Sequence, residues 1–277
     1  MNLVDAVRKW ANLAPNKTVV VDSTTDQRIT FADLLDRVIR LSNGFASLGL
    51  VKGDRVAILS TNSIEYFEIY YACAMSGLIA QPINWRLSAE EITRIIEDGE
   101  PSVFICQKEF LELQHEVRAT VTSNITYLEY GPETDESYET LVTQASAIDL
   151  YQDIGNADPV LILYTGGTTG LSKGALHTHH SLYMGMLNQT VAERVVPSDV
   201  YMLTGQMFHI PVALAMNYIA HGCPCVLMNF DAKLALELIQ NEKVSAFLGI
   251  TTMLNWMMAV EGFETYDISS LRNIQYG

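Results

Sequence analysis

Short apolar segments alternate with segments of helical periodicity along most of this 277-residue chain. The apolar runs expected to form strands before residue 110 are residues 18–23, 55–60, 78–83 and 102–106. The helices expected between them are residues 30–48, 63–76 and 89–98. Because parallel strands need crossover connections, this order favours largely parallel sheets flanked by helices, and we expect an α/β fold.

The pattern returns after residue 154, which predicts two similar lobes. The later strands are expected at residues 159–164, 174–179, 200–204, 224–228, 245–250 and 273–277, and the helices at residues 181–193, 210–220, 231–241 and 251–260. We predict a first α/β lobe at residues 1–154 and a second at residues 155–277. The acidic stretch at residues 131–141, near the end of the first lobe, is interpreted as a solvated connection.

Local signals mark where several helices begin and end. Ser88 with Glu91 is a capping box, and Thr30 with Asp33 resembles one with Asp in place of Glu. Gly99 is the expected stop of the helix that follows Ser88. These signals predict helix boundaries without reference to the rest of the fold.

Composition excludes several classes of function. Apolar residues make up 49% of the chain, and the formal net charge is −15, which disfavours nucleic acid as the main partner. No apolar run is long enough for an integral membrane segment, and the charged N-terminus does not resemble a secretory signal. We expect a cytoplasmic protein whose four cysteines are structural.

The stretch TGGTTGLSKG, residues 165–174, follows a buried strand and combines glycines, threonines and a lysine. Glycines let backbone N–H groups approach phosphate oxygens, hydroxyls donate to them, and Lys173 supplies a positive charge. The stretch is not a Walker loop, because Gly174 follows the lysine and a strand follows the glycine. A phosphate-binding hairpin loop is favoured over a surface turn without a ligand.

The run YTGGTTGLSKG at residues 164–174 resembles the signature of the adenylate-forming enzymes, which include acyl-CoA synthetases and firefly luciferase. Gly166 and Ser172 stand where that signature usually has Ser and Pro. The run MFHIP at residues 207–211 resembles their second core motif, with Gln206 at the usual proline. The resemblance extends over nearly the whole chain. It implies a truncated N-terminal domain of the acyl-CoA synthetase/luciferase-like fold, and we expect the C-terminal domain of that fold to be absent from this sequence.

The resemblance implies an acid–thiol ligase that uses ATP, Mg²⁺ and coenzyme A. A carboxylic acid, expected to be a medium- or long-chain fatty acid, becomes acyl-AMP and then a thioester. Lys173 would neutralise charge on the departing pyrophosphate, and Thr168 would bind Mg²⁺. The residues implied in holding the ATP phosphates are Thr165, Gly166, Gly167, Thr168, Thr169, Gly170 and Lys173.

The second motif implies substrate contacts for Phe208 and His209, with His209 also acting in catalysis, and the later run GITTML implies one for Thr252. A lone histidine after an apolar stretch could equally be a core residue; the neighbouring Phe208 favours the substrate role. The run HTHH at residues 177–180 lacks a carboxylate or cysteine at ligand spacing and is not interpreted as a metal site.

Other functions remain open at this stage. An aromatic-acid CoA ligase is the alternative within the enzymes, and a non-catalytic nucleotide- or phosphate-binding relative is the alternative outside them. The polypeptide alone is expected to be inactive, because the later motifs implied by the resemblance are absent from it. The sequence also leaves a homodimer open.

Overall fold

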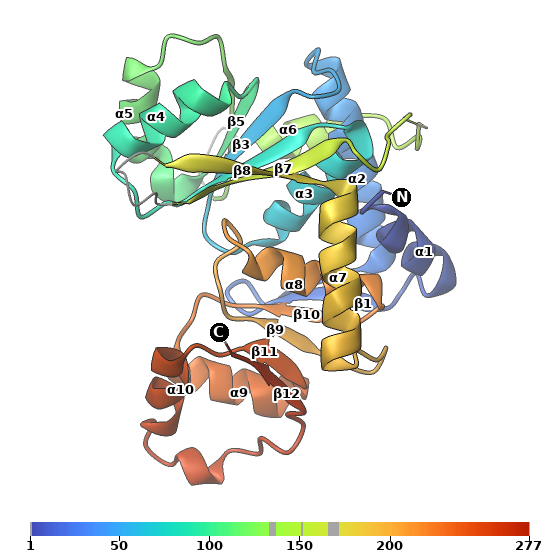
Figure 1. Cartoon of the computed structure of the whole chain (residues 1–277), viewed down its shortest axis with the longest axis vertical. Coiled ribbons are helices and arrows are strands. Elements are labelled where there is room, and N and C mark those ends of the chain that lie inside the picture. Colours follow the sequence, from blue (N-terminus) through green and yellow to red (C-terminus); the bar gives the residue numbers. More distant parts are fainter. Residues whose placement is uncertain (1, 133–136, 151, 166–171, 277) are drawn as a thin grey trace. The chain divides into compact units, whose positions relative to one another are not determined.

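Figure 1 shows the chain in a computed structural model, which describes residues 2–132, 137–150, 152–165 and 172–276. The expected α/β fold is confirmed, because the described residues form two six-stranded, mostly parallel sheets flanked by helices. Residue contacts divide the chain into two compact units. The first unit is Met1–Asp5, Leu35–Thr61 and Glu65–Tyr183, and the second is Ala6–Leu34, Asn62–Ile64 and Met184–Gly277.

The first unit contains one six-stranded sheet. Its strands, in spatial order, are β6 (Thr126–Tyr130), β5 (Val103–Gln107), β3 (Arg55–Leu59), β4 (Ile79–Ile83), β7 (Pro159–Thr165) and β8 (Lys173–Thr178). The pairs are parallel except that β8 runs antiparallel to β7. Its helices are α3 (Ile64–Ser76), α4 (Ala89–Gly99), α5 (Leu111–Thr120) and α6 (Ser137–Gln144), with the short 3₁₀ turn η1 (Lys108–Phe110) before α5.

The central strands of this sheet are buried on both faces. On β3, Ala57 and Leu59 pack into a cluster with isoleucines of α4, whereas Val56 and Ile58 point to the opposite face and are equally buried. Side chains alternate between the faces of a strand, so a near-continuous apolar run is what a doubly covered strand requires. This explains why the strand segments of the sequence lack polar alternation.

The second unit contains the other sheet. Its strands, in spatial order, are β12 (Asn273–Gln275), β11 (Ala246–Leu248), β9 (Tyr201–Leu203), β10 (Cys225–Leu227), β1 (Thr18–Asp22) and β2 (Gln27–Thr30). Only the β1–β2 pair is antiparallel among the pairs described. The helices are α1 (Asp5–Leu13), α8 (Pro211–Ala220), α9 (Ala232–Glu242) and α10 (Thr251–Met258), with the turn η2 (Phe263–Thr265); α2 (Phe31–Ser47) and α7 (His179–Glu193) each have residues in both units.

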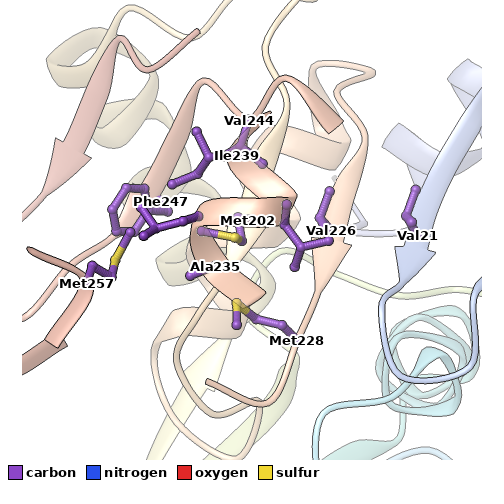
Figure 2. Close-up of a cluster of buried hydrophobic side chains, with 11 residues drawn as sticks. Val21, Met202, Val226, Met228, Ala235, Ile239, Val244, Phe247 and Met257 are labelled. Atoms are coloured by element: carbon purple, nitrogen blue, oxygen red, sulfur yellow. The ribbon is translucent and has the colours of Figure 1, made fainter. Parts of the chain in front are cut away.

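Helix α9 covers one face of the second sheet (Figure 2). Its Ala235 and Ile239 pack among Met202 of β9, Val226 of β10 and Phe247 of β11, all of them fully buried. Asp231 caps this helix by accepting a hydrogen bond from the backbone N–H of Leu234 (2.8 Å). The cap and the apolar face together explain why this segment forms a helix on the sheet.

Most of the local signals act as predicted. Ser88 and Glu91 form a complete capping box at the start of α4, and Thr30 and Asp33 exchange the equivalent bonds before α2. The predicted stop at Gly99 is wrong by one residue, because α4 includes Gly99 and Glu100 adopts the left-handed cap (φ 45°). Gly99 instead provides space, since a Cβ there would overlap the buried side-chain amide of Gln81.

The acidic stretch is not only a solvated connection. Helix α6 begins within it, and Tyr138 of the stretch is buried, as is Val142 directly after it. Each of the two compact units is built from several separate segments of the chain. The division into lobes at residues 1–154 and 155–277 stays a prediction. In the described part of the chain, no helix combines the length and the apolar character needed to cross a membrane.

Candidate functional site

The predicted phosphate loop connects β7 to β8 in the first unit. Thr165 and Lys173 are Cα partners at the end of this antiparallel pair, and both residues are exposed. The strand–hairpin–strand arrangement expected around the loop is therefore confirmed. Five of the predicted phosphate-binding residues lie outside the described residues: Gly166, Gly167, Thr168, Thr169 and Gly170.

Tyr164 anchors the stem of this hairpin to helix α4. Its hydroxyl donates to Oδ2 of Asp98 (2.6 Å), and burial together with this bond raises the pKa of Tyr164. Gly174 lies opposite Tyr164, where a Cβ would approach the phenol ring to 3.2 Å and the Ile162 side chain to 2.6 Å. The glycine lets the tyrosine lie across the hairpin, so the ends of both strands are fixed before the loop begins.

A pocket of ≈ 330 Å³ lies beside the hairpin stem. It is lined by Tyr164 and Ser172 together with Glu91, Arg94, Ile95, Glu97 and Asp98 of α4. A wall with three carboxylates and one guanidinium is unsuited to a polyphosphate, because the carboxylates repel it. We therefore do not assign this pocket to the phosphates.

The predicted substrate residues Phe208 and His209 lie in the second unit, in the loop that follows β9. Phe208 is half-buried and His209 is exposed. Nδ1 of His209 accepts a hydrogen bond from the backbone N–H of Ile210 (2.8 Å), which leaves the ring proton on Nε2. His209 is thus not a core histidine, and its Nε2–H is directed away from that backbone contact and can donate to an acidic oxygen.

Asn62 fixes the start of this loop, and sequence reasoning missed it. The side chain is 4% exposed, donates to the carbonyl oxygens of Gly205 (2.8 Å) and Met228 (2.9 Å), and accepts from the backbone N–H of Met207 (2.8 Å). The available signal was a polar residue three positions after the end of the buried strand β3, because ligands collect at the carboxyl ends of parallel strands.

Thr252, the remaining predicted substrate residue, lies in the first turn of α10 and is exposed. The structure therefore pairs Thr165 with Lys173 in the first unit and places Phe208, His209 and Thr252 in the second. Their roles toward a substrate stay predictions.

One histidine of the HTHH run, His179, has a structural contact. His179 is 1% exposed, and its Nδ1 accepts from the backbone N–H of Leu3 (3.3 Å). Burial lowers the pKa of His179 to about 4 and also lowers the pKa of His177. His179 is thus neutral at physiological pH and packs the N-terminal segment against the first unit.

A sequence profile described as AMP-binding enzyme matches residues 7–277. The chain belongs to the AMP-binding enzyme family. The N-terminal domain of FACL13 from Mycobacterium tuberculosis, solved with an inhibitor bound, superimposes with a TM-score of 0.92 at 29% identity, covering 100% of this chain and 69% of that one. That likeness confirms the fold resemblance found in the sequence.

Two curated relatives differ in their named substrates. The long-chain-fatty-acid–CoA ligase FadD13 of M. tuberculosis is 30% identical over 268 residues, which cover 96% of this chain and 53% of the relative. The feruloyl-CoA synthase of an Amycolatopsis species is 29% identical over 271 residues, 96% of this chain and 52% of the relative. The chain thus spans about half the length of these relatives, and it is a relative of acid–CoA ligases.

Proposed function

We propose that the protein containing this chain is an acid–thiol ligase that activates a carboxylic acid with ATP and transfers the acyl group to coenzyme A. The family membership supports the adenylating step. The observation that carries the proposal is the β7–β8 hairpin, whose closing residues Thr165 and Lys173 present a hydroxyl and an ammonium group at the base of a glycine- and threonine-rich loop.

Lys173 would act on the pyrophosphate side of the reaction. Its Cα is paired with that of Thr165 at the end of the β7–β8 pair, so its ammonium group would stand at the base of the loop that we propose to hold the phosphates. An ammonium group stabilises charge that develops on phosphate oxygens, and it does so best when it is positioned in advance. This is a charge-neutralising role and requires no protein nucleophile.

His209 would act on the acid. Its Nε2–H can donate to a carboxylate oxygen, and the bond from the Ile210 N–H to Nδ1 sets the ring orientation. Phe208 beside it offers an aromatic surface for the acyl part. Together the two side chains would orient a carboxylate for attack.

The proposed reaction has two displacements. A carboxylate oxygen bonds to the α-phosphorus of ATP while the bond to the pyrophosphate oxygen breaks, which gives acyl-AMP and pyrophosphate. The thiol sulfur of coenzyme A then bonds to the acyl carbon, AMP leaves, and the thiol proton passes to solvent. Mg²⁺ would supply charge neutralisation on the phosphates; its predicted ligand Thr168 lies outside the described residues, so no step is assigned to it.

A medium- or long-chain fatty acid is our first proposal for the substrate, and the similarity to a fatty-acid ligase supports it. An aromatic acid is the second candidate, because a feruloyl-CoA synthase is almost equally similar. Identities of 29–30% do not separate the two classes.

The test is ATP–pyrophosphate exchange by the full-length protein with octanoate, palmitate and ferulate. Exchange with either fatty acid supports the first candidate, and exchange with ferulate alone supports the second. Lys173→Ala should lower the exchange rate by about 10²–10³-fold. Lys233→Ala is the matched control, because that lysine is exposed on α9 and forms a surface pair with Glu237 (3.7 Å). Retained ATP binding without exchange with any acid would instead support a non-catalytic nucleotide-binding relative.

A further inference from the structure

Asn62 makes a saturated set of donor contacts in the second unit. Both amide hydrogens are used, one on the carbonyl oxygen of Gly205 and one on that of Met228, at 2.8 and 2.9 Å. The amide oxygen accepts from the backbone N–H of Met207 at 2.8 Å. All three partners are backbone groups, so the contacts depend on the asparagine and not on the side chains that it meets.

The hydrogen bonds of Asn62 lie just beyond the ends of two neighbouring strands of the second sheet. Gly205 and Met207 follow β9, and Met228 follows β10, and these two strands are parallel neighbours with Cys225 opposite Tyr201. Parallel neighbours end at the same edge, where open α/β sheets bind ligands. Asn62 therefore bridges two adjacent loops at the ligand-binding edge of the second sheet.

The segment that Asn62 fixes leads directly into Phe208 and His209. Met207 is fully buried, and its bonded N–H is one residue from Phe208. Gly205 is buried as well, and a Cβ there would approach the Pro211 ring to 2.5 Å, so the chain returns closely on itself into α8. The loop thus has its start bonded to Asn62 and its end packed at Pro211, with the two predicted substrate residues between them.

We infer that Asn62 is a positioning residue for acid activation, which sets where Phe208 and His209 stand without touching the substrate. The inference rests on the proposed function. No other side chain of similar size reproduces its contacts, because Asp lacks the two donors, Leu lacks donors and acceptor, and Gln is one methylene longer. Small displacements of an orienting group lower kcat more than they lower substrate affinity.

The first arm of the test measures hydrogen exchange in the loop after β9 and does not depend on enzymatic activity. Amide hydrogen exchange resolved to single residues should show a protected Met207 in the unmutated chain. Asn62→Ala should speed exchange at Met207 by about tenfold or more, a loss of about 1.4 kcal/mol of protection. Amide hydrogen exchange in β9 and β10 should not change. Equal acceleration at Met207 and in both strands would argue for a general structural role of Asn62.

Asn43→Ala is the matched control. The Asn43 amide nitrogen also donates to two backbone carbonyls, those of Ser146 (2.7 Å) and Ile148 (3.0 Å), but in the first unit. This variant should leave exchange at Met207 unchanged. If Asn62→Ala does not fold, Asn62→Leu keeps about the same size while removing both donors and the acceptor, and it should speed exchange at Met207 relative to this control.

The second arm measures the full-length protein by ATP–pyrophosphate exchange with palmitate and ferulate. Asn62→Ala should lower kcat by about 10²-fold while KM for ATP stays within about twofold. Asn43→Ala should change neither. An Asn62→Ala enzyme with unchanged kcat, or an unprotected Met207 amide in the unmutated chain, would overturn the inference. Absence of exchange by the unmutated protein with any acid would count against the proposed function, and the hydrogen-exchange arm would still decide the role of Asn62 in the loop.

Discussion

Replacing Arg37 by alanine should strongly destabilise the first unit, because this arginine neutralises a buried carboxylate. Glu68 of α3 is 1% exposed. Arg37 of α2 binds it through Nε (2.5 Å) and Nη2 (3.0 Å), and binds Glu139 of α6 as well (2.8 and 3.0 Å). Hydrogen bonds to Glu139 and Glu68 raise the pKa of Arg37 despite its burial. The single substitution thus removes four charge-assisted bonds and leaves the buried Glu68 side chain without its ion-pair partner.

The expected loss in the free energy of unfolding depends on the contacts that Glu68 retains in the variant. Breaking a buried ion pair by removing one partner costs about 3–5 kcal/mol. The Tyr138 hydroxyl still donates to Glu68 (2.7 Å), and the Arg37 side chain is 26% exposed, so we expect the lower end, about 3 kcal/mol. At about 2–4 °C per kcal/mol, the midpoint of thermal unfolding should fall by about 6–12 °C.

The assays are thermal and urea denaturation of the chain, both followed by circular dichroism, with Arg94→Ala as the control. Arg94 also pairs with a glutamate, Glu90, but both side chains are more than half exposed, so its loss should cost about 0.5 kcal/mol or less. The double variant Arg37→Ala/Glu68→Gln should recover part of the loss, because it no longer buries a charge. A loss for Arg37→Ala no greater than that of the control would refute the reasoning.

Three further contacts are tested by substitution, with the same denaturation measurement. Burial lowers the pKa of His179 from 6.5 to about 4, so the contribution of neutral His179 to the free energy of unfolding is present above pH 6.5 and is lost as the pH drops toward 4. Of a total contribution of about 3 kcal/mol, about 1.4 kcal/mol should be lost by about pH 5.5. His179→Gln should lack this component, and equal pH profiles would contradict it. Gly99→Ala should cost about 1–3 kcal/mol because its Cβ overlaps the buried Gln81, and a stabilised variant would contradict that overlap. Gly185→Ala, with open space on the exposed face of α7, should instead stabilise by about 0.5–1 kcal/mol. Tyr164→Phe should cost about 1–2 kcal/mol through the lost bond to the α4 carboxylate, and unchanged stability would show that this bond does not anchor the hairpin.

The candidate site was predictable where it depends on a contiguous run. The glycine- and threonine-rich stretch between two apolar segments predicted a hairpin, and Thr165 and Lys173 are paired at its end. The bond from Tyr164 to Asp98 joins residues 66 positions apart, and the bond from Asn62 to Gly205 joins residues 143 positions apart. No local sequence pattern predicts either of these hydrogen bonds, so they could be identified only in the folded chain.

The sequence by itself determined the local elements of this protein. Apolar runs produced the buried strands, and side-chain caps such as Ser88 with Glu91 started the helices, because these signals act over a few residues. The tertiary structure alone decided which strands share a sheet, pairing β1 with β10 across about two hundred residues, and it docked α6 through Glu139 and Tyr138. The physical reason is that pairing and burial depend on groups far apart in the chain, whose approach no local pattern specifies.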